Sequence, residues 1–239
     1  MTESDVFDSA RRTLAVAHER GTNLCDPFVE SLPISGAAIS VMSGAVGQST
    51  ISSSNAVAAR LDELQFDLGE GPCWQAFKTR RPALGFNLRT GDNDEWPVFA
   101  EAVRSDAVAS DVSAIFAFPL TVGSLDIGAV DLYTTSPVDL TPQQVAGATS
   151  LAEVAAWQVL RRVLSEQDVD ALGGEQSAAR TSRREVHQAT GMVLAQLNIS
   201  AEDAALLLRA HAFSSGRSVR DISTDVVERR LDFSQRGLS

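Results

Sequence analysis

The sequence predicts an α+β protein in which an antiparallel sheet flanked by helices is followed by a long connecting helix and a C-terminal three-helix module. Strand and helix patterns mix in the first part without the regular alternation of a doubly wound fold. A long helical pattern then starts at Thr141, and the chain beyond residue 181 is helical by pattern. We therefore predict one domain at 1–164, with its core at about 35–164, a linker with the end of the connecting helix at 165–181, and a second domain at 182–239.

Length and composition exclude several classes of protein. The 239 residues, 44% of them hydrophobic, are enough for a medium domain and a small one. No apolar run reaches membrane length and the first residues are acidic and polar, so we expect a cytoplasmic protein with no membrane partner. The only cysteines are Cys25 and Cys73, which fits a reducing compartment. The three histidines lack partners at ligand spacing, so we expect no metal site, and we expect no cofactor.

Charge is distributed unevenly along the chain. The net charge of −11 disfavours a nucleic-acid partner for the protein as a whole. Residues 180–239, however, hold 9 Lys or Arg against 7 Asp or Glu, a net charge of +2, and residues 1–179 hold the remaining excess of acid. This asymmetry is weak evidence for a C-terminal segment that contacts a polyanion.

The elements of the first domain follow from apolar spacing and from turn residues. Apolar residues at helical spacing predict a first helix that stops at Gly21, and alternation between residues 35 and 54 predicts strands. A helix capped by Asn55 and a short helix that opens at Pro72 come next, followed by a third short helix at WPVFAEAVRSD. Two further strands, SAIFAFPLTV and DIGAVDLYTT, are joined by a turn that predicts an antiparallel hairpin.

The second half is punctuated by helix caps. Thr141 with Gln144 is a capping box that starts the connecting helix, a natural coiled-coil partner, and Gly173-Gly174 is the best hinge candidate. Beyond it, three hydroxyl residues each stand three positions before a carboxylate, as at a helix start, and predict helices near 182–197, 200–214 and 218–231. These pairs are Ser182 with Glu185, Ser200 with Asp203, and Ser218 with Asp221.

A glycine in the first of these helices needs an explanation, because glycine inside a helix costs about 1 kcal/mol relative to alanine. At 100° per residue, Gly191 falls on the side opposite the apolar stripe, together with Arg184, Gln188 and Ala195. Small residues there let something approach the backbone. Two partners fit: another helix, of this chain or of a dimer mate, or a nucleic acid that takes donors from Arg184 and Gln188.

Residues 189–227 resemble the ANTAR domain, a three-helix RNA-binding module of bacterial transcription antiterminators. The shared features are Ala189-x-Gly191, the helix entry at 200–204, Leu208-Arg209, Ala212, 219–222 and Val226-Val227. Many relatives carry Lys where this chain has Thr190, and Thr there resembles actinobacterial members. The resemblance implies a homodimer that binds paired RNA hairpins in a leader transcript, so that a terminator cannot form. The expected RNA-binding residues are Arg183, Arg184, Gln188, Thr190, Gly191, Arg217 and Arg220, of which Thr190 is included through the resemblance and the others through their face or charge.

Residues 35–164 resemble the GAF domains that precede ANTAR modules in actinobacterial proteins, through LGEGPCWQAF, WPVF, AIFAFPLTVG and DIGAVDLY in that order. The resemblance implies a sheet domain that senses a small molecule. Candidate ligand-binding residues are Cys73, Trp74, Phe116, Phe118, Asp131 and Tyr133, although core packing explains the aromatic ones equally well. Gly69 and Gly71 fit a tight turn rather than a phosphate loop, since position 74 is Trp.

The function expected from both resemblances is a signal-responsive RNA-binding transcription antiterminator that is not an enzyme. Two alternatives remain at this point. The C-terminal helices loosely resemble a helix-turn-helix of a DNA-binding regulator, but the last helix carries Asp221, Asp225 and Glu228 beside Arg220, a poor surface for a major groove. The second alternative is a GAF-type redox enzyme that uses Cys73, which has no His or acidic pair near it in sequence.

Overall fold

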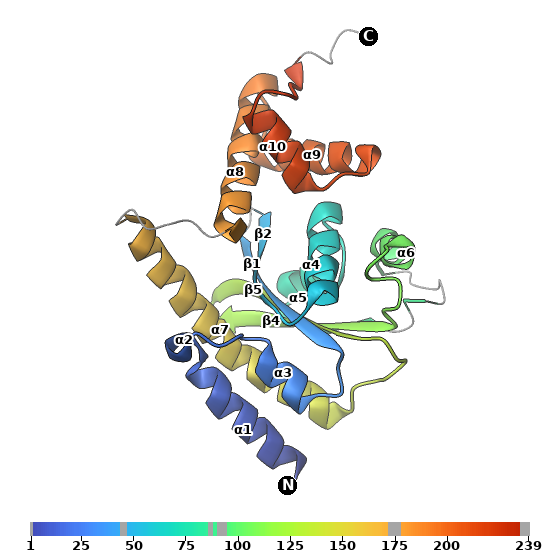
Figure 1. The fold of residues 1–239 in the computed structure, drawn as a ribbon, viewed down its shortest axis with the longest axis vertical. Helices are drawn as coiled ribbons and strands as arrows, with labels where there is room; N and C mark the ends of the chain where they lie inside the picture. Colours follow the sequence, from blue (N-terminus) through green and yellow to red (C-terminus); the bar gives the residue numbers. More distant parts are fainter. Residues whose placement is uncertain (1, 44–46, 86–87, 90–94, 172–177, 235–239) are drawn as a thin grey trace. The chain divides into compact units, whose positions relative to one another are not determined.

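The computed structural model describes residues 2–43, 47–85, 88–89, 95–171 and 178–234, with their side chains except those of 18, 43, 47–48, 166–171 and 178–184 (Figure 1). Contacts divide the chain into two compact units, the first holding most of residues 1–174 and the second holding Glu175–Ser239. The predicted hinge at Gly173-Gly174 lies outside the described residues.

The first unit is built on a five-stranded sheet with the strand order β2-β1-β5-β4-β3. Strand β5 is central: it is antiparallel both to β1, where Asp131 faces Ala38, and to β4, where it faces Ala117. The predicted hairpin between β4 and β5 is confirmed, and Gly123 at its turn has φ +60°. The strands are β1 (Gly36–Ser43), β2 (Gly47–Ser53), β3 (Ala83–Gly85), β4 (Ala114–Val122) and β5 (Leu125–Thr134).

Seven helices are described in this unit: α1 (Glu3–Ala15), α2 (Ala17–Arg20), α3 (Asp26–Ser31), α4 (Ala56–Leu68), α5 (Pro72–Thr79), α6 (Pro97–Ser105) and α7 (Pro142–Ala171). The expected caps are confirmed: Asn55 Oδ1 accepts the Ala58 N–H at 2.9 Å, and Thr141 and Gln144 bond each other's backbone N–H groups. The single first helix expected up to Gly21 is wrong, because the chain breaks at Val16 into α1 and α2.

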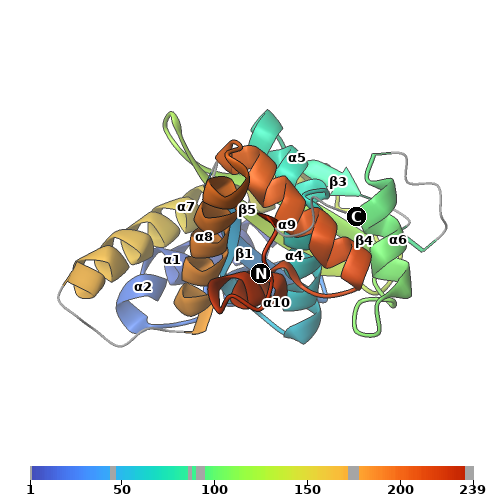
Figure 2. The same ribbon diagram turned by 90° about the horizontal axis from the view of Figure 1, so that it is seen from above.

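The sheet separates two layers of different character. One face packs on α1, α3 and α7 and forms the main core, with Phe116, Phe118, Val130 and Leu132 fully buried (Figure 1). Helix α1 lies beside α7 in both views (Figure 2). The other face carries α5, which contacts both β4 and β5, and Cys73 of α5 packs there on Met42 and Ala129. Because successive side chains of a strand point to opposite faces, Asp131 and Tyr133 belong to this second face.

The second unit is a three-helix module of α8 (Ala178–Leu197), α9 (Ala201–Ser215) and α10 (Val219–Val227). The caps at Ser200 and Ser218 are confirmed, since each hydroxyl accepts a backbone N–H three residues later at 3.0–3.1 Å. The cap expected at Ser182 is wrong, because α8 already begins at Ala178. The core of the three-helix module contains Val186, Ala189, Val193, Ala204, Leu208, Ala212, Val219, Ile222 and Val226.

Within the described part of the chain, no single helix has the length and apolar character needed to span a membrane. The pair Glu185–Leu197 and Ala201–Ser215, bent by 107°, meets that test on length and composition only.

Candidate functional site

A buried carboxyl on the second face of the sheet is the centre of the first candidate site. Asp131 is 6% exposed and stands in the middle of the central strand. Gln65 of α4 donates from Nε2 to Asp131 Oδ2 at 2.5 Å. The other oxygen, Oδ1, has no hydrogen-bond partner among the described residues. A buried polar atom without a hydrogen-bond partner lowers the stability of the folded state. The hydrogen-bonding capacity of Oδ1 is therefore not satisfied in this interior.

Gln65 joins three elements around this carboxyl. Its Oε1 accepts the backbone N–H of Cys73 at 2.8 Å, and its backbone carbonyl accepts the indole N–H of Trp74 at 2.8 Å. The site therefore brings Cys73, Trp74 and Asp131 together, as expected, and adds Gln65. Sequence reasoning missed Gln65 because a glutamine in an amphipathic helix carries no signal of a partner 66 residues away.

Gly71 permits this arrangement. Its φ is +137°, a conformation open essentially to glycine, and a Cβ there would lie 2.6 Å from Cγ and Oε1 of Gln65. Pro72 then opens α5 in its first turn. The predicted tight turn at Gly69 and Gly71 is confirmed, since both have positive φ.

A second carboxyl lies nearby on α4. Asp62 is 2% exposed and accepts hydrogen bonds from the hydroxyl of Ser40, at 2.6 Å, and from that of Thr50. Burial raises the pKa of Asp131 well above its ordinary value, the charge of Asp62 raises it further, and the bond from Gln65 acts in the opposite direction. The protonated acid is thus favoured at Asp131 in the folded state.

This pKa shift predicts a pH-dependent stability. The folded state binds the Asp131 proton more tightly than the unfolded chain, so the contribution is complete below about pH 4 and is lost as the pH rises through the folded pKa. Asp131→Asn should remove this component, so that the variant gains on the wild type by up to about 1.4 kcal/mol for each pH unit in that window. Urea unfolding at a series of pH values measures the difference. Parallel curves for the two proteins would contradict the shift.

The remaining sheet residues of the expected pocket are not all brought together. Phe116 and Phe118 belong to the main core beneath α1 and α7, on the face of the sheet opposite Asp131. The prediction that they line one pocket together with Asp131 is therefore wrong. Both faces of β4 are apolar, so the alternation of residues along the strand could not show to which face of the sheet Phe116 and Phe118 belong. Tyr133 shares the face of Asp131, but its hydroxyl donates to Asn55 Oδ1 at 3.1 Å and so supports the cap of α4.

Both cysteines are buried and free of disulfides. Burial raises the pKa of the Cys25 thiol to about 12. Cys73 is 0% exposed, with Met42 and Ala129 against it. A nucleophilic or redox-active cysteine needs thiolate character and access, and burial opposes both.

The second candidate site is the outward face of α8. Gly191 is exposed, and a Cβ built on it would meet no atom within 4 Å in the described part of the chain. Gln188 and Ala195 are also exposed, and at 100° per residue they lie with Gly191 inside an arc of roughly 60°. Within the described part of the second unit, no helix packs on Gly191.

Thr190 does not share this face. Its side chain is 6% exposed, and its hydroxyl donates to the Val186 carbonyl oxygen at 2.8 Å. It lies one residue, or roughly 100°, away from Gly191, towards the buried stripe. The structure therefore places the Thr190 side chain inside the module.

The arginines expected to contact RNA differ in what they touch. Arg217 Nη1 pairs with Asp225 Oδ2 at 2.7 Å, and Arg220 Nε lies 3.9 Å from Glu185 Oε2. Arg217 and Arg230, through their hydrogen bonds, lower the pKa of Asp225. Arg183 and Arg184 belong to α8, but their side chains lie outside the described part of the structure.

Two family models match the chain, one in each unit. The GAF domain model matches residues 18–157, more than half of the chain, and the ANTAR domain model matches residues 176–227. The chain belongs to the GAF domain family. A GAF domain joined to an ANTAR domain supports a signal-responsive regulator. No curated protein matches the sequence.

Solved structures similar to this chain include GAF domains and an enzyme. The GAF domain of a phosphoenolpyruvate-protein phosphotransferase from Coxiella burnetii is 11% identical, with 70% of this chain and 98% of that one covered and a TM-score of 0.54. The corresponding domain from Acinetobacter is 9% identical, with 69% and 97% covered and a TM-score of 0.49. A free methionine-R-sulfoxide reductase from Neisseria meningitidis, bound to its substrate, is 10% identical, with 67% and 91% covered and a TM-score of 0.47. At such identities the likeness concerns the fold alone.

Proposed function

We propose that the protein is a signal-responsive transcription antiterminator of the cytoplasm, in which the ANTAR domain binds hairpin RNA in a leader transcript and the GAF domain senses a small molecule. The observation that carries the proposal is the open face around Gly191. Helix α8 keeps a destabilising residue on its surface, because no described residue of the second unit packs on this glycine. Close approach by a ligand accounts for it.

RNA suits this face better than duplex DNA. Single-stranded loops present unstacked bases that a shallow surface with a few hydrogen-bond donors can read. Gln188 offers an amide on the same face of α8 as Gly191. Arg184 lies on the same side by helical position. Helix α10, by contrast, exposes Asp221 near Arg220, which opposes entry into a major groove.

The basic residues supply affinity rather than sequence readout. Arg220 borders the outward face of α8, because its partner Glu185 lies roughly 60° from Gln188 around this helix. Its pair with Glu185 at 3.9 Å is long and partly exposed, and such pairs contribute little, so a phosphate can replace the carboxylate. Arg183, Arg184 and Arg217 would make similar phosphate contacts, which predicts RNA affinity that falls steeply with salt.

The cluster around Asp131 is the proposed sensor. Its unpartnered Oδ1, together with Trp74 of α5, offers a small ligand one polar contact and one aromatic surface. A ligand that bonds this oxygen removes a buried unsatisfied group, which favours binding. Regulation requires that the ligand bind more tightly to one of two states of the protein. We propose no catalytic step, since the buried Cys73 lacks the access that a redox enzyme needs.

Helix α7 is the proposed dimer contact. Trp157 and Leu164 are 54% and 51% exposed, and Leu160, between them at spacings of three and four residues, is partly buried. This spacing is the seam of a two-stranded coiled coil. Exposed apolar residues on a helix are explained by burial against a second copy.

The dimer contact predicts that Leu164→Ser weakens self-association at least about tenfold, because it removes an apolar side chain from the seam. Sedimentation equilibrium measures the dissociation constant. Leu125→Ser is the matched control, since Leu125 is also 51% exposed but lies in β5. Equal association of both variants and the wild type would contradict this interface.

A mobility-shift comparison tests the proposed function. The full chain is titrated into a hairpin RNA and into duplex DNA of the same sequence, each at two salt concentrations. We expect a preference for the hairpin and weaker binding at the higher salt. Preference for duplex DNA would establish the DNA-binding alternative. Reduction of methionine sulfoxide that disappears in Cys73→Ser would establish the enzyme alternative.

A further inference from the structure

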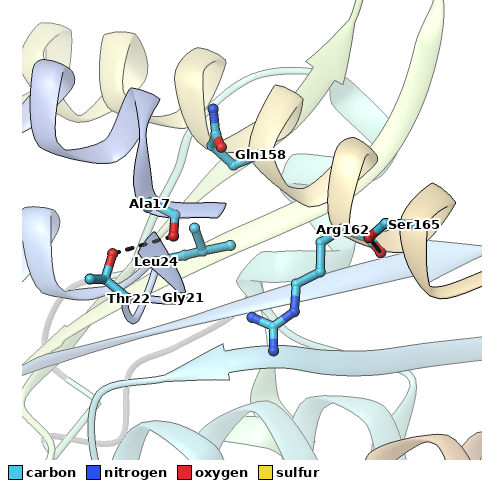
Figure 3. Close-up of a pocket in the computed structure, with 7 residues that line it drawn as sticks. All are labelled: Ala17, Gly21, Thr22, Leu24, Gln158, Arg162 and Ser165. Carbon is cyan, nitrogen blue, oxygen red and sulfur yellow. Dashed lines mark hydrogen bonds between the residues drawn. The ribbon is translucent and has the colours of Figure 1, made fainter. Parts of the chain in front are cut away.

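A separate pocket lies on the other side of the sheet domain, between α7 and the segment that follows α1. It encloses about 250 Å³. The segment contributes Ala17, Gly21, Thr22 and Leu24, and α7 contributes Gln158, Arg162 and Ser165 (Figure 3). Ala17 and Leu24 belong to the main core beneath α7, so this pocket is distinct from the Asp131 cluster.

Gln158 gives the pocket an unused acceptor. The residue is 4% exposed, and its Nε2 donates to the Ala15 carbonyl oxygen at 2.9 Å. Its Oε1 has no hydrogen-bond partner in the described part of the chain. The bond at Nε2 fixes the amide of Gln158, which is one of the residues that line the pocket. A ligand with an N–H or O–H group would satisfy Oε1.

Arg162 gives the pocket a positive charge. It follows Gln158 by four residues and therefore lies one turn further along the same face of α7. Figure 3 shows its side chain reaching from α7 into the space beside Gly21 and Leu24. A guanidinium carries five N–H donors, so it can keep a contact within the chain and still bind a carboxylate.

The remaining walls set the size and character of the ligand. Thr22 Oγ1 lies 3.5 Å from the Ala17 carbonyl oxygen, a long bond that leaves the hydroxyl able to turn towards a ligand. Ala17 and Leu24 add apolar surface. The volume of about 250 Å³ is slightly below the usual range for ligand pockets and fits a compact molecule.

We propose that this pocket binds a small carboxylate that carries an N–H or O–H donor, such as a free amino acid or hydroxy acid. The carboxylate contacts Arg162, the donor contacts Gln158 Oε1, and the aliphatic part contacts Leu24. Because two of the contacting residues, Gln158 and Arg162, belong to α7, an occupied pocket ties this helix to the segment after α1. The chain then holds a second effector site, beyond the one proposed at Asp131.

Calorimetric titration of the full chain tests the proposal. The probes are the twenty free L-amino acids with lactate and glycerate, and each probe that binds is repeated as its carboxamide. We expect at least one acid to bind and its carboxamide to bind at least about tenfold more weakly. Gln158→Leu removes the acceptor and Ser165→Leu fills the pocket, and each should weaken binding by a similar factor. Ser150→Leu, the same change more than four turns away on α7, should bind as the wild type does.

Three results would overturn the proposal: no probe binds, the carboxamides bind as tightly as the acids, or binding persists in both Gln158→Leu and Ser165→Leu. Persistence in both variants would place the ligand elsewhere, for example at Asp131. Circular dichroism of each variant separates loss of the site from loss of the fold. None of these results depends on RNA binding, so failure here leaves the proposed function standing.

Discussion

Replacing Gly191 with leucine is expected to weaken binding of hairpin RNA at least about tenfold while leaving the module folded. The open space above Gly191 would be filled by a side chain that no residue of the described chain restrains. RNA that approaches the backbone there would be held away from Gln188. Leucine is a better helix former than glycine, so the free energy of unfolding should rise by about 0.5–1 kcal/mol. A variant that is more stable but binds RNA more weakly shows that this face binds RNA. A face needed for folding would lose stability when it is changed.

A matched pair of alanines controls for added bulk. Ala195 and Ala210 are both exposed, but Ala195 lies on the Gly191 face of α8 and Ala210 lies on α9. Ala195→Leu should weaken RNA binding and Ala210→Leu should not. Filter binding and urea unfolding give the two quantities for each variant. Unchanged affinity in both Gly191→Leu and Ala195→Leu would show that RNA binds elsewhere.

Gly71→Ala is expected to lower the free energy of unfolding by about 3 kcal/mol and to disrupt the Asp131 cluster. Alanine cannot adopt φ +137° without strain, and its Cβ would lie 2.6 Å from Gln65. Displacing Gln65 breaks the bonds to Asp131 and to the Cys73 N–H together. The loss should be visible as a lower urea midpoint and as a red shift of tryptophan emission, since Trp74 bonds the Gln65 carbonyl oxygen.

The variant Gly123→Ala separates the cost of backbone strain at positive φ from the cost of losing the Gln65 hydrogen bonds. Gly123 also has positive φ, at +60°, but a Cβ there would meet no atom within 4 Å among the described residues. Its variant should therefore lose only about 1 kcal/mol, the backbone part of the cost. If Gly71→Ala loses no more than Gly123→Ala, the close packing of Gly71 on Gln65 is not part of the site.

Local signals predicted the elements well, for a physical reason. Helix caps depend on residues three positions apart, so Thr141, Ser200 and Ser218 were identifiable from sequence. Hairpin turns are equally local, which is why β4 and β5 were paired correctly. Ser182 failed as a cap because serine is also tolerated inside a helix, and nothing in the sequence distinguishes the two.

Long-range placement is what the sequence could not supply. Gln65 and Asp131 are joined only when α4 packs on the central strand, and no pattern in either segment indicates the other. The sequence could not assign Phe116 and Phe118 to a face of the sheet, because β4 is apolar on both faces. The Gly191 face was predictable because a helix wheel is local geometry, whereas the burial of Thr190 depends on how the three helices pack.

The central claim is that RNA contacts the backbone of α8 at Gly191. Its most direct test is the amide resonance of Gly191 in a ¹⁵N-labelled full chain titrated with a hairpin RNA. We expect this resonance, with those of Gln188 and Ala195, to shift on addition of the RNA and not to shift with duplex DNA of the same sequence. If the three resonances stay unchanged while other residues of the ANTAR domain respond, the proposed face is contradicted.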